Sequence, residues 1–178
     1  MRRILTILIG TLLLVACKSP EARRPVSSKS GSFIDESVAR NIKLNEREQA
    51  YIKKIMEENP ENTYIASKNG FWYYYNVKQA DSLMSPDFGD IVNFNYSIKT
   101  LNDELIYSKE DLKNQTYAMD KQELFSGLRE GLKLMRAGET VTFMFPSQKA
   151  YGYYGDENRI GVNVPIKCEV SVHSIIDK

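Results

Sequence analysis

The sequence predicts an α+β domain in which an antiparallel sheet is covered by one short helix, with a small helical appendage before it. Two observations support this fold class. Four β-rich segments follow one another after Pro60, and apolar and polar residues alternate in them as in strands with one buried face. Between them, residues 123–139 (ELFSGLREGLKLMRAGE) carry apolar residues at helical spacing. A sheet with one wet face and one covered face is the natural assembly of these elements.

The strand pattern is clearest in three segments, 90–100, 139–145 and 166–174. In each of them every second residue is apolar, so we expect the residues between to face water. The residues expected on the buried face are Val92, Phe94, Tyr96, Ile98, Val141, Phe143, Phe145, Cys168, Val170 and Val172. The fourth segment, 63–77, contains Asn69-Gly70, which predicts a hairpin with a type I′ turn.

The helix of the predicted domain carries two glycines beside its apolar stripe. The stripe consists of Leu124, Leu128, Leu132 and Met135. A glycine inside a helix costs about 1 kcal/mol relative to alanine. Gly127 and Gly131 therefore predict that the helix backbone lies very close to the sheet.

Residues 1–16 resemble the signal peptide of a bacterial lipoprotein. A positive MRR precedes an apolar run, ILTILIGTLLLVA, that is too short to cross a bilayer comfortably. The run leads into LVAC, which matches a lipobox with Cys17 as the residue to be acylated. An ordinary signal peptide followed by a chance cysteine is the alternative. Residues 17–32, rich in Ser, Pro and Arg, are expected to be the lipid anchor and a flexible tether.

Residues 33–60 are expected to form the helical appendage, and residues 61–178 the domain. Within the appendage, the spacing of Ile34, Val38, Ile42 and Leu44 suggests a first, shorter helix. Asn45 and Glu48 resemble a capping box at the start of a second helix. Asn59-Pro60 would end that helix, because the residue before proline disfavours helical geometry. The sequence leaves open whether the appendage packs on the domain or on a partner.

Composition excludes several classes of function. The chain has 24 Lys and Arg against 23 Asp and Glu, so its net charge of +1 argues against a nucleic-acid partner. The single histidine, His173, is expected to point away from the core, which excludes a Ser-His-Asp or Cys-His device. Cys168 is expected to be a buried, inert thiol. No His and Cys cluster has metal-ligand spacing, so neither a metal nor a cofactor is expected.

Four stretches resemble, in order and without forced gaps, the FKBP-type peptidyl-prolyl isomerase domain. They are FGDIVNFNYSI, NDELIYS, ELFSGLREGLKLMRAGETVTFMFPSQKAYG and YGDENRIGVNVPIKCEVSVHSI, and they span about Gly89 to Ile176. The resemblance implies an FKBP-like antiparallel sheet wrapped on one short helix, and isomerase activity that needs no cofactor. The lipobox, the helix at Asn45 and the GFWYYY stretch further resemble the FKBP-like lipoproteins associated with gliding motility in Bacteroidetes.

The resemblance also implies a prolyl pocket. Tyr96, Phe125 and Tyr151 would be its catalytic residues, with a backbone N–H at Leu124–Phe125 holding a substrate carbonyl and the Tyr151 hydroxyl anchoring the peptide. The residues that bind substrate would be Ile106, Tyr107, Tyr117, Leu124, Leu128, Ile160 and Cys168. Residues 150–160, AYGYYGDENRI, would be the flap over this pocket.

Three positions depart from the family pattern. Tyr107 stands where the family usually has an Asp that organises the hydrogen bonds of the pocket. Cys168 replaces a Phe, and Gln115 replaces a further aromatic residue of the pocket. These departures allow a reduced activity, so three functions stay open: an isomerase, a weakly active or inactive FKBP-fold chaperone or binding module, and a structural lipoprotein whose pocket is vestigial.

The resemblance implies an isomerase anchored to a bacterial envelope membrane, where it assists the folding or assembly of envelope proteins, gliding-motility proteins among them. Its partners would be envelope proteins that contain Xaa-Pro bonds, and the bilayer through acylated Cys17. The residues after this cysteine, KSPEA, lack an acidic cluster, so we expect the domain to face the periplasm. The oligomeric state and the choice between inner and outer membrane are left open.

Overall fold

The computed structural model describes residues 30–80 and 83–178. The predicted signal peptide, Cys17 and nearly all of the predicted tether lie outside these residues. By its internal contacts the chain divides into a unit Met1–Ser37 and a unit Val38–Lys178. The first unit is described only from Ser30, where helix α2 begins. The second unit holds the rest of α2 and the whole predicted domain.

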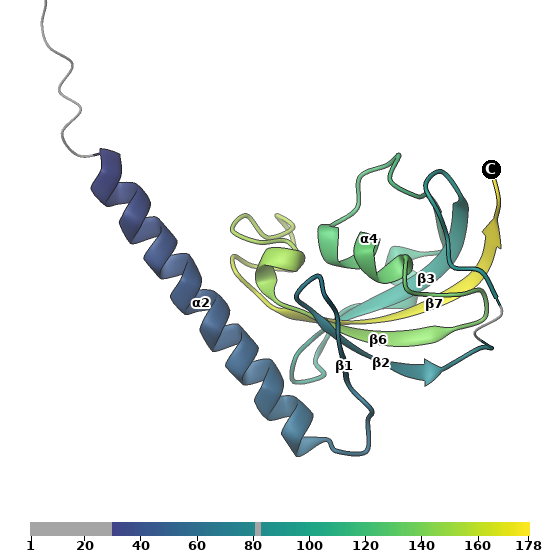
Figure 1. Cartoon of the computed structure of the whole chain (residues 1–178), viewed down its shortest axis with the longest axis horizontal. Coiled ribbons are helices and arrows are strands. Elements are labelled where there is room, and N and C mark those ends of the chain that lie inside the picture. The colour runs from purple at the N-terminus through teal and green to yellow at the C-terminus, as the bar shows by residue number, and fades with distance from the viewer. Residues whose placement is uncertain (1–29, 81–82) are drawn as a thin grey trace, which may run out of the picture. The chain divides into compact units, whose positions relative to one another are not determined.

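The domain is built on an antiparallel sheet, in which the described residues form seven strands (Figure 1). The strands are β1 (Ile65–Ala66), β2 (Trp72–Val77), β3 (Ile91–Thr100), β4 (Leu105–Tyr107), β5 (Gln115–Ala118), β6 (Thr140–Phe145) and β7 (Ile166–Ile176). They lie in the order β1-β2-β6-β7-β3-β4, and β5 also pairs with β3. The two longest strands, β3 and β7, pair side by side, with Tyr96 opposite Val170 and Ile98 opposite Cys168.

Helix α4 (Ser126–Leu132) covers one face of this sheet, as Figure 1 shows. All ten residues predicted on the buried face of the strands are buried in the structure. A Cβ atom added to Gly127 would lie 2.6 Å from the Lys149 carbonyl oxygen, and one added to Gly131 would lie 3.0 Å from the Phe143 ring. The predicted close approach of the helix backbone to the sheet is therefore confirmed.

The other face of the sheet is partly covered, which corrects the prediction of a wet face. Met144 on β6 is fully buried there, in a second core cluster with Ile52, Ile55 and Leu101. The two isoleucines belong to α2, and their spacing forms an apolar stripe on that helix. The C-terminal half of the predicted appendage therefore packs on the domain.

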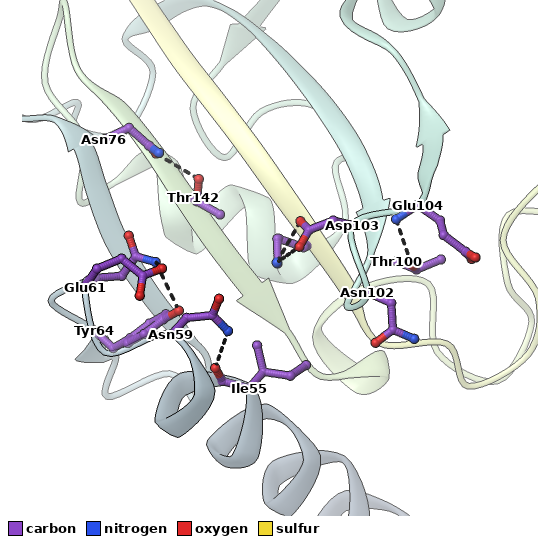
Figure 2. Close-up of polar contacts among 12 residues, drawn as sticks. Ile55, Asn59, Glu61, Tyr64, Asn76, Thr100, Asn102, Asp103, Glu104 and Thr142 are labelled. Atoms are coloured by element: carbon purple, nitrogen blue, oxygen red, sulfur yellow. Dashed lines mark hydrogen bonds and ion pairs between the residues drawn. The ribbon is translucent and has the colours of Figure 1, made fainter.

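Helix α2 (Ser30–Glu58) is one continuous helix of 29 residues, so the prediction of a second helix starting at Asn45 is wrong. The Asn45 side chain accepts a hydrogen bond from Gln148 Nε2 at 2.9 Å instead of capping a helix. The last three residues of the predicted tether, 30–32, are helical. The helix ends as predicted: Asn59 Nδ2 donates to the Ile55 carbonyl oxygen at 2.7 Å (Figure 2).

The hairpin between β1 and β2 is confirmed, but its turn is not type I′. That turn needs a positive φ at both central residues, and of Asn69 and Gly70 only the glycine has one, at 81°. Ser67 explains the difference, because its hydroxyl accepts from the Asn69 N–H at 3.1 Å and its carbonyl accepts from the Gly70 N–H at 3.2 Å. Local side-chain bonds of this kind select a turn that the dipeptide alone does not reveal.

Two short helices complete the domain. They are α3 (Lys109–Leu112) and the 3-10 helix η1 (Ser147–Lys149), which leads into the predicted flap. Over the part of the chain that the structure describes, no helix is both long and apolar enough to cross a membrane.

Candidate active site

The structure brings the predicted pocket residues together between the sheet and α4. All ten belong to, or pack against, one core cluster. The members that form its buried wall are Tyr96, Tyr117, Leu128, Ile160 and Cys168. The partly buried members that pack against it are Ile106, Tyr107, Leu124, Phe125 and Tyr151. Six different segments of the chain supply these side chains, so the sheet and its helix are what hold them at one place.

An open pocket lies at the edge of this cluster. It is lined by Gln122, Glu123, Leu124, Phe125, Arg129 and Tyr151. The rings of Phe125 and Tyr151 pack with their centroids 5.1 Å apart, and Phe125 also meets the ring of Phe145 edge-on at 5.6 Å. The mouth of the pocket is therefore aromatic, and Arg129 and Glu123 place one charge of each sign on its rim.

Four tyrosines of the cluster divide into two pairs by their hydrogen bonds. The Tyr107 hydroxyl donates to Asp156, and the Tyr117 hydroxyl donates to the Gln122 carbonyl oxygen at 3.2 Å. The hydroxyls of Tyr96 and Tyr151 make no hydrogen bond to any described residue. These two phenols are therefore the ones left to bond a ligand.

Burial keeps both of these phenols protonated. It raises the pKa of Tyr96 from 10.0 to about 12, with smaller contributions from Cys168 and Tyr107. Burial also raises the pKa of Tyr151, helped by nearby Tyr96 and Cys168. A neutral phenol at physiological pH is a hydrogen-bond donor. Tyr151 lines the open pocket, and Tyr96 lies in the core cluster at whose edge the pocket opens.

A third donor lies at the start of α4. Phe125 is the residue before the first turn of this helix, and its backbone is extended, with φ −60° and ψ 144°. Its N–H has no acceptor among the described residues, while its carbonyl already accepts from the Arg129 N–H at 3.1 Å. The Phe125 N–H is therefore free beside the aromatic mouth of the pocket. The resemblance to the family implies that a substrate carbonyl binds there.

The flap carries a carboxylate that the sequence analysis did not single out. Asp156 Oδ1 accepts from the N–H groups of Asn158 at 3.0 Å and Ile160 at 2.7 Å, and its other oxygen accepts from the Tyr107 hydroxyl. The family Asp is absent at position 107, but the structure supplies a carboxylate to this tyrosine from the opposite loop. An Asp side chain in a polar loop often accepts from the backbone N–H two residues further on, as Asp156 does from Asn158.

Arg159 fixes the end of the flap that contains Asp156. Its guanidinium lies over the Tyr107 ring, 4.8 Å from the centroid, and donates to the Ile106 carbonyl oxygen at 2.9 Å. It also pairs with Asp111 on α3 at 3.0 Å. These contacts hold the far end of the flap onto β4 and α3, next to the pocket.

The remaining predicted positions lie as expected or outside the pocket. Burial raises the pKa of the Cys168 thiol, which stays an uncharged wall residue. His173 is exposed on β7. Gln115 bonds the Leu112 carbonyl instead of lining the pocket mouth. Over residues 30–80 and 83–178, no three His, Cys, Asp or Glu side chains gather closely enough to hold a metal ion.

Comparison with known proteins agrees with this site. Residues 84–173, about half of the chain, match the model of the family described as FKBP-type peptidyl-prolyl cis-trans isomerase. The chain therefore belongs to the FKBP-type peptidyl-prolyl isomerases, and it is an enzyme of this class.

Two solved structures show the same fold. A peptidyl-prolyl cis-trans isomerase from Pseudomonas syringae superposes with a TM-score of 0.58 at 18% identity, covering 74% of this chain and 96% of that one. FkpA from Escherichia coli superposes with a TM-score of 0.59 at 19% identity, covering 96% of this chain and 81% of that one. At these identities the likeness is one of fold.

Proposed function

We propose that this isomerase acts on Xaa-Pro bonds of envelope proteins, in the pocket under the flap, while acylated Cys17 holds it at the membrane. One observation carries the assignment of the pocket. The Tyr96 and Tyr151 hydroxyls and the Phe125 N–H are free of protein partners among the described residues, and they belong to a cluster of buried apolar side chains. Such a site suits a peptide whose carbonyls need donors and whose proline ring needs an apolar wall.

The reaction needs no acid or base. Rotation about the Xaa-Pro bond must break amide resonance, which sets a barrier of about 18–20 kcal/mol for peptide bonds. The twisted amide is less polar than the planar one, so an apolar pocket favours the transition state over the ground state. Tyr151 and the Phe125 N–H would orient the peptide without taking a proton from it. Uncatalysed isomerisation takes tens of seconds or longer, so a client that waits for it folds faster with help.

Removing one hydroxyl tests this assignment. Tyr151→Phe should lower kcat/KM for an Xaa-Pro peptide about fivefold, the effect of one hydrogen bond of about 1 kcal/mol. Tyr74→Phe is the matched control, because this tyrosine lies on β2 and meets Tyr64 edge-on, outside the pocket cluster. Equal kcat/KM for native protein and Tyr151→Phe would remove Tyr151 from the proposed site.

The location of the protein is proposed from the N-terminal sequence. A positive start, an apolar run and LVAC in that order support a lipoprotein signal peptide, and two or more acyl chains anchor a protein stably. Cys17→Ser should abolish fatty-acid labelling and partition into detergent, while the domain keeps its fold. A mutant that still partitions into detergent would contradict the anchor. Protease cleavage of the domain on intact cells would contradict the periplasmic orientation alone.

A client-holding function is a second candidate, and one observation favours it. Tyr153 and Tyr154 on the flap are 71% and 79% exposed and meet each other edge-on. Exposed tyrosines are common where proteins bind partners. If they hold clients, Tyr153→Ser with Tyr154→Ser should weaken the suppression of aggregation of an unfolded protein. The rate on a short Xaa-Pro peptide should stay unchanged.

A further inference from the structure

Glu48 is a buried carboxylate that the prolyl pocket does not contain. It lies on α2, in the Val38–Lys178 unit, and its side chain reaches Ser147, the first residue of η1, 99 residues further along the chain. Glu48 is only 6% exposed. Burying a carboxylate is costly unless hydrogen bonds compensate it, so its partners are informative.

Both oxygens of Glu48 bind one residue. Oε2 accepts from the Ser147 N–H at 2.7 Å, and Oε1 accepts from the Ser147 hydroxyl at 2.7 Å. The two bonds together fix the position and orientation of Ser147 relative to α2. Among the hydrogen bonds that the described residues of α2 make to the rest of the domain, these are the two that are buried.

Ser147 in turn holds the start of the flap. Its carbonyl oxygen accepts from the Ala150 N–H at 3.0 Å and from the Gly152 N–H at 2.8 Å. These two residues flank Tyr151 directly. The N–H groups on either side of Tyr151 therefore both donate to the Ser147 carbonyl oxygen. The N–H of Ser147 itself donates to Glu48.

Helix α4 supports the flap start from the other side. Ser126 Oγ donates to the Lys149 carbonyl oxygen at 3.4 Å, and Gly127 leaves room for that carbonyl. The α2 contact is the shorter and better buried of the two. The ring of Tyr151 packs on Phe125, so a small rotation of η1 would change the distance between the two proposed donors.

We propose that Glu48 is a positioning residue of the isomerase: through Ser147 it sets the place of Tyr151 over the pocket. The inference rests on the proposed role of Tyr151. It makes helix α2 a part of the catalytic unit, because the helix supplies the carboxylate that orders the flap.

Three variants test the inference. Glu48→Ala removes both acceptors and should lower kcat about tenfold with KM changed by less than about twofold, because small misplacements of catalytic groups have large rate effects. Glu48→Gln keeps an acceptor for the Ser147 N–H and a group that can bond its hydroxyl, so kcat should return to within about twofold of native. Asn45→Ala is the matched control, because it removes an exposed contact between the same two elements and should leave kcat unchanged.

A direct readout separates this inference from the proposed function. Amide NMR shifts of Ala150 and Gly152 should move in Glu48→Ala and stay near native in Glu48→Gln and Asn45→Ala. If the native protein shows no isomerase activity, the proposed function fails, and the NMR shifts still decide whether Glu48 orders the flap. A folded Glu48→Ala protein with native kcat and native shifts would overturn the inference. If Glu48→Ala does not fold, Ser147→Ala, which removes one of the two bonds, should give an intermediate loss, and native kcat there would overturn it as well.

Discussion

The Tyr107 hydroxyl donates a hydrogen bond to the Asp156 carboxylate, across 49 residues of sequence. Tyr107 lies on β4 at the pocket, and Asp156 lies in the flap. Burial would raise the pKa of Asp156, but the bonds from Tyr107 and from the N–H groups of Ile160 and Asn158 outweigh it and lower the pKa. The far end of the flap is therefore held by a charged acceptor, as its near end is held by Glu48.

Removing this acceptor should loosen the flap. Asp156→Ala should lower kcat/KM on an Xaa-Pro peptide and lower the free energy of unfolding by about 1–3 kcal/mol, because the Ile160 and Asn158 N–H groups and the Tyr107 hydroxyl lose a charged partner. Tyr107→Phe removes only one of the three bonds and should have a smaller effect on both quantities. Peptide kinetics and denaturant unfolding show which variant loses more activity and stability. A larger loss in Tyr107→Phe than in Asp156→Ala would contradict this account of the flap.

Asp156 also predicts a loss of stability in acid. Its pKa is lower in the folded protein than its ordinary value, so it contributes stability that is fully present above about pH 4 and is lost as the pH falls through the folded pKa. Thermal unfolding of native protein and Asp156→Asn should differ at neutral pH, and the difference should shrink below about pH 4. A difference that stays constant down to pH 2 would show that the charge of Asp156 is not the cause.

The pocket phenols predict an activity that is flat around neutral pH. Tyr96, with a pKa of about 12, and Tyr151, whose pKa is also raised, both remain donors there. Because the folded pKa of Tyr96 is raised, its contribution to stability is present below pH 10 and is lost as the pH rises toward 12. We expect kcat/KM to be constant between about pH 6 and about pH 9. A fall in that range that tracks the ionisation of a pocket phenol would contradict the donor assignment.

At Gly127 on α4, alanine should lower the stability of the domain, although alanine has the higher helix propensity. Alanine at an exposed helix position would stabilise by about 1 kcal/mol, but here its Cβ would lie 2.6 Å from both the Lys149 carbonyl oxygen and the Phe145 ring. We therefore expect Gly127→Ala to destabilise the domain by about 1–3 kcal/mol in denaturant unfolding. Gly161→Ala is the control, because its nearest neighbour would be 3.7 Å away, and a similar loss in both variants would refute the steric explanation.

The sheet and its helix could be predicted because their pattern is local. In β3, β6 and β7 the alternation of apolar and polar residues shows which side chains face the core. The glycines of α4 show that the backbone of this helix lies close to the sheet. The candidate pocket residues came from the resemblance to the family motifs, and the structure gathers them in or against one core cluster.

The supports of the flap could not be predicted in the same way. Glu48 looks like a capping residue from its neighbours, and Asp156 looks like a solvated acid in a loop. Their roles depend on Ser147 and Tyr107, which lie far away in sequence, and no local pattern reports such a pairing. The covered second face was missed for the same reason, because Met144 occupies a position that alternation assigns to water.

We propose that the pocket under the flap catalyses Xaa-Pro isomerisation with donors that need no proton transfer. The most direct measurement is the cis-trans exchange rate of an Xaa-Pro peptide, followed by NMR exchange spectroscopy with native protein and with the Tyr96→Phe, Tyr151→Phe double variant. We predict exchange well above background with native protein, unchanged when the solvent is D₂O, and a large loss of this acceleration in the double variant. Exchange at the background rate with native protein, or equal acceleration by the double variant, would contradict the claim.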